Sequence, residues 1–214
     1  MFTVEDPKGR RWRIEKNDLG LFKTLIGRYE SEENRFIPNL PKVPEELWWQ
    51  MVKFFQYYAD KHLEAACCLL FDKKKREYEM MVPVQKVEPA VVDYNIEMIY
   101  EYLDLHPDII WVADFHSHHQ MMTFFSSTDD RNERGTRLYG VFGDFDPKTR
   151  EFNILLRAGC HGMYTRLDAA DLLENYEERN SFINKIKPRC FPIFWARQVD
   201  KSKVIDTRLL KEVL

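Results

Sequence analysis

Hydrophobic positions along the chain alternate between helical and extended spacing. Residues 44–62, "PEELWWQMVKFFQYYADKH", predict a helix with Pro44 as its first residue, a position that suits proline. One apolar face recurs at intervals of three or four residues, at Leu47, Met51, Phe54 and Tyr58. Two further helices are expected at 93–105 and at 168–186, the latter with Asp168 as its N-cap.

Extended runs lie between these helices. Two pairs of runs, each joined by a short polar segment, predict hairpins: 63–71 with 78–87, and 137–145 with 151–159. Residues 108–115, "DIIWVADF", form an apolar run typical of a buried strand. This order of elements predicts an α/β (α+β) single domain, with a mixed β-sheet flanked by helices.

The chain divides into three parts by composition. We expect an N-terminal extension at 1–43, the folded domain at 44–184 and a basic C-terminal tail at 185–214. The extension ends in "RFIPNLPKVP", whose prolines predict an extended connector. The tail holds eight Lys or Arg against two Asp between Lys185 and Lys211, a pattern typical of a solvated face, and we assign it no function.

The composition limits the kinds of partner that we expect the chain to bind. The 214 residues are 44% hydrophobic and 31% charged, with a formal charge of −3, so we expect neither nucleic acid nor an anionic membrane as partner. The longest apolar run, "AACCLLF", is far shorter than a membrane span, and the start of the chain has no apolar signal region. Cys67 and Cys68 lie within that run and suit buried reduced thiols. A cytoplasmic location follows as the expectation.

The segment "HSHHQMMTFFSSTDD", residues 116–130, carries the candidate chemistry. His116 and His118 flank one residue at the end of the predicted strand, and alternate residues of an extended chain point to the same side. Neutral imidazole is a good zinc ligand, and Asp129 is the candidate third ligand from a neighbouring element. Ser126 precedes Asp129 by three residues, so both share one face if a helix begins there, and Thr128 or Ser126 itself could cap that helix.

Several metal folds use a His-x-His pair. A metallo-β-lactamase needs Asp and His at the positions that Gln120 and Met121 occupy here, and a cupin needs a glutamate a few residues further on. An amidohydrolase barrel is the stronger rival, because "DFHSH" matches its strand end. Only 96 residues follow His118, however, too few for the rest of a barrel of about 250 residues.

The spacing of His116, His118, Ser126 and Asp129 resembles the JAMM motif of the JAB/MPN zinc metalloprotease family, in a divergent prokaryotic branch. The family's upstream glutamate corresponds to Glu64, which precedes an apolar run that leads into a hairpin. The resemblance covers roughly residues 60–170. The chain departs from the family pattern at two places, where His119 replaces a frequent proline and Ala66, Cys67 and Cys68 replace usual glycines.

The resemblance implies one zinc ion per chain, held by His116, His118 and Asp129, with a fourth position open. Glu64 would then be the general base and Ser126 a hydrogen-bond donor to the oxyanion. We expect His119 not to be a ligand.

Three histidines show no partner pattern: His62, His106 and His161. Phe124 and Phe125 are expected in the core.

The implied reaction is hydrolysis of a peptide or isopeptide bond, which releases a ubiquitin-like modifier from a conjugate or trims its C-terminal tail. Family members of this kind act beside E1-like or E2-like proteins. Two other functions stay open: a metal-free MPN-type scaffold, and a zinc hydrolase of a small peptide or metabolite.

Overall fold

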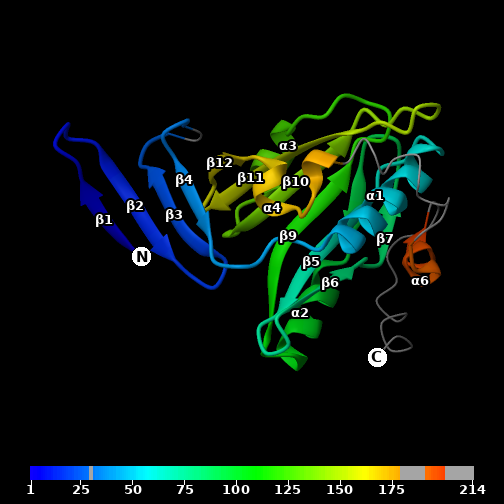
Figure 1. Ribbon diagram of the computed structural model, residues 1–214, viewed down its shortest axis with the longest axis horizontal. Helices are drawn as coiled ribbons and strands as arrows, with labels where there is room; N and C mark the ends of the chain where they lie inside the picture. The colour runs from blue at the N-terminus through cyan, green and yellow to red at the C-terminus, as the bar shows by residue number, and fades with distance from the viewer. Residues whose placement is uncertain (29–30, 179–190, 201–214) are drawn as a thin grey trace.

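The computed structural model describes residues 1–28, 31–178 and 191–200. The first part of the chain forms a four-stranded antiparallel sheet in chain order, here called the N-terminal sheet: β1 (Phe2–Glu5), β2 (Arg11–Lys16), β3 (Gly20–Leu25) and β4 (Arg35–Pro38). It lies at one end of the molecule, beside β12 (Figure 1). Leu19 and Phe22 join the main core, and the Asn34 amide donates to the Tyr164 carbonyl at 2.8 Å.

The main body is built on a six-stranded mixed sheet. Its spatial order is β12 (Met163–Leu167), β11 (Asn153–Cys160), β10 (Arg137–Gly143), β9 (Ile109–Ser117), β5 (Ala66–Asp72) and β6 (Glu77–Met81). β9 and β10 run parallel, and the other neighbours are antiparallel. The expected α+β class with a mixed sheet is therefore confirmed.

Helices cover both faces of this sheet. Strand β5 sends alternate side chains to opposite faces, as the pleat of a strand requires. Cys67, Leu69 and Phe71 pack in one hydrophobic cluster with the buried side of α1 (Glu45–Ala59). Cys68 and Leu70 pack on the other face with Ile99 of α2 (Ile96–Leu105). Both cysteines are buried free thiols, as expected.

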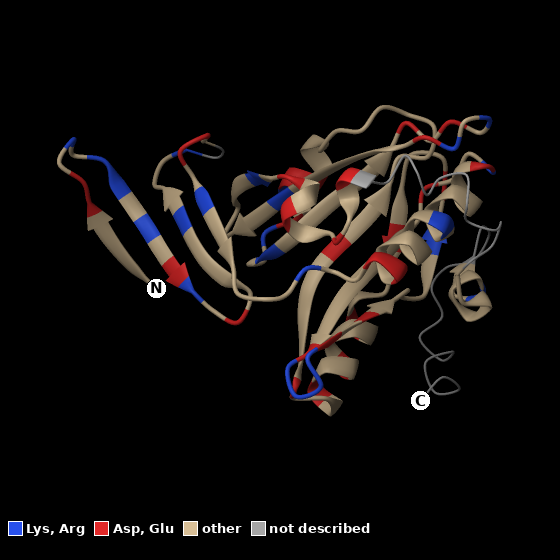
Figure 2. Ribbon diagram, in the orientation of Figure 1, with Lys and Arg blue, Asp and Glu red and all other residues tan. Residues whose placement is uncertain are grey.

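The remaining elements are short. A third sheet has the order β13 (Val199–Asp200), β7 (Gln85–Val87) and β8 (Val92–Tyr94), and the small helices are α3 (Ser127–Asn132), α4 (Ala169–Leu172), η1 (Tyr176–Glu178) and α6 (Ile193–Arg197). Acidic and basic residues are interspersed over most elements (Figure 2), which agrees with the near-neutral charge. Within the part of the chain that the structure describes, no helix is long and apolar enough to cross a membrane.

The expected hairpins and the central strand are present, while three boundaries differ. Pro44 is the N-cap of α1 and not its first residue. The run 78–87 is divided between β6 and β7, which belong to different sheets. The second helix starts at Ile96, because the Asn95 side chain accepts a hydrogen bond from the Met98 amide and caps it.

The prediction of one long helix at 168–186 is wrong for residues 173–178. Asp168 caps a helix as expected, but that helix ends at Leu172. The Val43 amide donates to the Leu172 carbonyl at 2.8 Å, and the Glu174 amide donates to the Val43 carbonyl at 3.0 Å. This bridge draws the chain out of the helix, so a tertiary contact overrides the local pattern. Residues 179–186, and the tail 185–214 apart from 191–200, lie outside the described residues.

Candidate metal centre

The end of β9 places two imidazoles side by side. His116 belongs to the strand and His118 follows it, held by its amide, which donates to the Phe142 carbonyl at 2.7 Å. Because residues two apart in an extended chain face the same way, the two rings meet, with 3.3 Å between their Nε2 atoms. The His118 Nδ1 lies 3.2 Å from the Met122 carbonyl oxygen. A proton on Nδ1 satisfies that oxygen and leaves Nε2 free to act as a ligand.

The carboxylate of Asp129 comes from α3. Ser126 is the N-cap of that helix, and a capping box joins the two residues: the Ser126 hydroxyl accepts from the Asp129 amide at 3.2 Å, while Asp129 Oδ2 accepts from the Ser126 amide at 2.6 Å. Asp129 Oδ1 is left to face the histidines, 3.6 Å from His116 Nε2. The cap is therefore Ser126, not Thr128.

The spacing of the three ligand side chains, His116, His118 and Asp129, suits a zinc ion. Zinc bonds of about 2.0–2.1 Å at tetrahedral angles hold neighbouring ligand atoms about 3.3 Å apart. The separations of 3.3 Å and 3.6 Å are close to that value, and the ligand atoms of His116, His118 and Asp129 all lie within 4.8 Å of one another. Burial lowers the pKa of His116 to about 4, against the opposing effect of the Asp129 charge. The imidazole is thus neutral near pH 7, which is the form that binds metal.

Strand pairing brings Glu64 to the same place. In the pair of β5 and β9, Ala66 lies opposite His116. The Ser117 amide donates to the Ala65 carbonyl at 2.9 Å, and the Ser117 hydroxyl accepts from the Ala65 amide at 3.1 Å. Glu64 comes directly before Ala65, so these bonds hold it beside the end of β9.

Glu64 is not a solvated surface residue, because only 5% of it is exposed and it lines the same cavity as the three donors. Burial, and then the charge of Asp129, raises the pKa of its carboxyl to about 8. A carboxyl group with a raised pKa next to a metal site is a candidate proton carrier.

The cavity has a volume of about 600 Å³ and is also lined by residues of β8 and α2. Val92 and Tyr94 of β8 and Tyr100 of α2 belong to this lining. So does Phe124, whose ring centroid lies 4.8 Å from that of His118. It is 43% exposed, so the expectation that Phe124 is a core residue is wrong.

His119 is turned away from the donors. Its Nε2 lies 2.9 Å from the Pro89 carbonyl oxygen, and its Nδ1 accepts from the Gln120 amide at 2.6 Å. Both ring nitrogens therefore have other partners in the described chain. Its backbone φ of 43° lies in the left-handed region.

Arg157 fixes the position of α3, a role that the sequence did not reveal. The buried guanidinium donates to Asp130 at 2.7 Å and to Glu133 at 2.6 and 2.9 Å, and it stacks on Phe125 at 3.8 Å. Charge-assisted bonds of this forked kind give strong geometric control. Arg157 lies on β11, so the central sheet holds the helix that carries Asp129.

Comparisons with known proteins give little further information. No model of a protein family matches the chain, and no curated protein matches it. Among solved structures, the chain is similar to the solution structure of protein DSY2949 from Desulfitobacterium hafniense. The two are 13% identical, the match covers 59% of this chain and 89% of that one, and the TM-score is 0.45.

Proposed function

We propose that the chain is a zinc-dependent peptidase or isopeptidase of the JAB/MPN kind. The observation that carries the proposal is the meeting of Glu64 with His116, His118 and Asp129 in one cavity. Glu64 precedes β5, the two histidines lie at the end of β9, and Asp129 belongs to α3, in the combination that the JAMM-like spacing implies. A zinc ion held by the three donors would supply Lewis-acid activation of water and of a substrate carbonyl group.

Glu64 and Ser126 would carry the proton and the charge of the reaction. The Glu64 carboxylate takes a proton from the attacking water and donates it to the leaving nitrogen, so that the amine departs uncharged. The charge of a metal ion at the neighbouring centre would favour the ionised form of Glu64 that accepts the first proton. The Ser126 hydroxyl accepts from the Asp129 amide, which leaves its own O–H free to donate to the developing oxyanion.

The proposed substrate is the C-terminal tail of a ubiquitin-like modifier, free or in a conjugate, with E1-like or E2-like proteins as partners. JAB/MPN relatives bind such a tail as an added strand. In the described part of the chain, β8 pairs with β7 on one side only, and its side chains line the cavity. Backbone hydrogen bonds to such an edge suit an extended peptide of any sequence.

Metal content tests the site. We expect His116→Ala, His118→Ala and Asp129→Ala each to lose most of about one zinc equivalent, because each removes one of three donors. His119→Ala is the matched control and should keep it. Full zinc retention at this centre in the three donor variants would refute the site and favour the metal-free scaffold.

Activity measurements test the role of Glu64 and the proposed substrate. Glu64→Gln should keep zinc and lose about a hundredfold or more in kcat on a diglycine-ended modifier conjugate. The same conjugate with its last glycine changed to valine should be cut far more slowly by the wild type. Equal cutting of both conjugates would reject a threaded tail, and hydrolysis of small peptides alone would favour the small-substrate hydrolase.

A further inference from the structure

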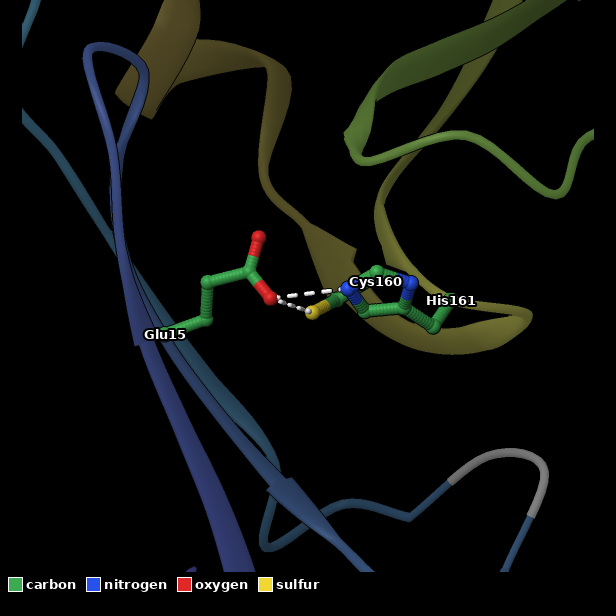
Figure 3. Close-up of side chains that lie close together, drawn as sticks. All are labelled: Glu15, Cys160 and His161. Atoms are coloured by element: carbon green, nitrogen blue, oxygen red, sulfur yellow. Dashed lines mark hydrogen bonds and ion pairs between the residues drawn. The ribbon is translucent and has the colours of Figure 1, made fainter. Parts of the chain in front are cut away.

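A second group of ligand side chains lies between the N-terminal sheet and the central sheet. Glu15 comes from β2, Cys160 ends β11, and His161 stands in the turn to β12 (Figure 3). Glu15 Oε2 is 2.8 Å from His161 Nε2 and 3.7 Å from Cys160 Sγ. The three ligand atoms all lie within 4.8 Å of one another.

The turn that presents His161 does not itself require a histidine. Cys160 pairs with Met163, and the two residues between them, His161 and Gly162, have φ values of 51° and 75°. Such two-residue turns need positive φ at both positions, which Gly, Asn, Asp and His adopt more readily than other residues. The turn therefore accepts His161, and the contact with Glu15 at 2.8 Å sets the position of its imidazole.

Burial and charge favour a divalent cation at this place. Cys160 is fully buried and the Glu15 side chain is 15% exposed, so the thiol and the carboxylate share a poorly hydrated space. A thiolate, a carboxylate and a neutral imidazole around a divalent ion make a neutral group, which a buried site accommodates. The mixture of sulfur, nitrogen and oxygen donors suits zinc. The His161 side chain is 51% exposed, which gives an ion a path from solvent.

We propose that Glu15, Cys160 and His161 bind a zinc ion that fastens the N-terminal sheet to the central sheet. On binding, the Cys160 S–H bond breaks, its proton goes to solvent and a sulfur–zinc bond forms, with no change of oxidation state. Without the ion the thiol is protonated, because burial and then the Glu15 charge raise its pKa to about 11. Glu15 and Cys160 are 145 residues apart, so the ion would join distant parts of the chain. The proposal does not depend on the function of the first centre.

Cobalt distinguishes the two centres. Metal-free full-length protein, kept reduced, is titrated with Co²⁺ and followed by absorption. A cobalt ion bound to a thiolate gives a sulfur-to-metal charge-transfer band in the near ultraviolet, and the centre at His116, His118 and Asp129 contains no sulfur donor. We expect the band in the wild type and, undiminished, in the His116→Ala/His118→Ala variant.

Matched variants assign the band. Cys160→Ala should abolish it, while Cys190→Ala, which removes a different thiol, should keep it. Glu15→Gln, which preserves the shape of the side chain, should weaken cobalt binding by about tenfold or more. No band in the wild type, or a band that persists in folded Cys160→Ala, would reduce the group to a hydrogen-bonded Glu–His pair and overturn the proposal.

Hydrogen exchange tests the fastening role. In the His116→Ala/His118→Ala background, zinc should slow amide exchange in β2 and β3, because a ligand that binds only the docked arrangement stabilises it. Adding Glu15→Gln should remove most of this protection. If the cobalt titration shows metal binding but zinc leaves amide exchange in β2 and β3 unchanged, the fastening role would be refuted.

Discussion

Ser126 has a structural role and a proposed catalytic role. Its hydroxyl accepts from the Asp129 amide, and its own amide donates to Asp129 Oδ2. The capping box therefore sets the rotation of the carboxylate that offers Oδ1 to the metal centre. A loss of activity on removing the hydroxyl would not by itself separate oxyanion stabilisation from a misplaced Asp129.

Substitutions at Ser126 separate the two roles. Ser126→Ala should lower the free energy of unfolding by about 1 kcal/mol, whereas Ser126→Gly should cost only a few tenths, because glycine is tolerated at an N-cap. Both should lower kcat by about a hundredfold if the hydroxyl donates to the oxyanion. Ser126→Thr keeps hydroxyl and cap and should stay near the wild type. Urea unfolding, zinc content and kcat are the measurements, and a zinc-loaded Ser126→Gly with wild-type kcat would leave Ser126 with the cap alone.

At the scale of single residues, the sequence was enough to predict contacts between residues that are close together in the chain. His116 and His118 are two residues apart on a strand, and Ser126 and Asp129 are three apart at a helix start, so backbone geometry alone brings each pair together. The contact of His161 with Glu15 spans 146 residues and follows from the docking of two sheets. No spacing rule predicts such a contact.

At the scale of elements, the proposed substrate tail would pair with the edge of strand β8 that faces away from β7. The Glu88 amide donates to the Val91 carbonyl, and the Asn95 amide donates to the Val84 carbonyl. Because alternate residues of an antiparallel strand bond to the same neighbour, the backbone groups of Val92 point away from β7. An extended tail could pair there while its side chains enter the cavity.

Val92→Pro tests this edge. Proline removes an N–H that β7 does not use, and its ring hinders a strand added on that side. We expect KM for the diglycine-ended conjugate to rise by about tenfold or more, with little change in zinc content or unfolding free energy. Val92→Thr keeps the N–H and serves as the control. An unchanged KM in Val92→Pro would place the substrate elsewhere.

Helices and strands could be predicted from the sequence where one of their faces is strongly apolar. Helix α1 and strands β5 and β9 bury long runs of side chains, and each is found close to its expected position. The strands of the N-terminal sheet are short and mix charges with apolar residues, and all four residues of β1 are exposed, so little periodicity marks them. The end of α4 at Leu172 depends on a bridge to Val43, which local sequence does not encode.

For the molecule as a whole, the candidate metal centre carries a cost in stability. Glu64 is buried beside Asp129, and the charged form of a carboxyl group is disfavoured in such a place. Its pKa is about 4.5 in the unfolded chain and about 8 in the folded one. The folded state therefore binds this proton more tightly, and Glu64 adds stability below pH 4.5 that is lost progressively as the pH rises through 8. Stability given up at a reacting group is common in enzymes.

Comparing Glu64→Gln with the wild type at two pH values measures this cost. Both proteins are made metal-free with a chelator and unfolded in urea, so that the other titrating groups contribute equally and cancel in the difference. At pH 5 the wild-type carboxyl is largely protonated in the folded state and resembles the amide, so the two stabilities should be close. At pH 9 it must ionise in its buried position, and Glu64→Gln should be more stable by about 5 kcal/mol, because the pKa rises from 4.5 to about 8 on folding and each pKa unit is worth about 1.4 kcal/mol. Glu101→Gln, the same substitution at an exposed glutamate, is the control. A difference between Glu64→Gln and wild type that is the same at pH 5 and pH 9 would mean that Glu64 ionises freely in the metal-free folded chain. It would then carry no cost in stability.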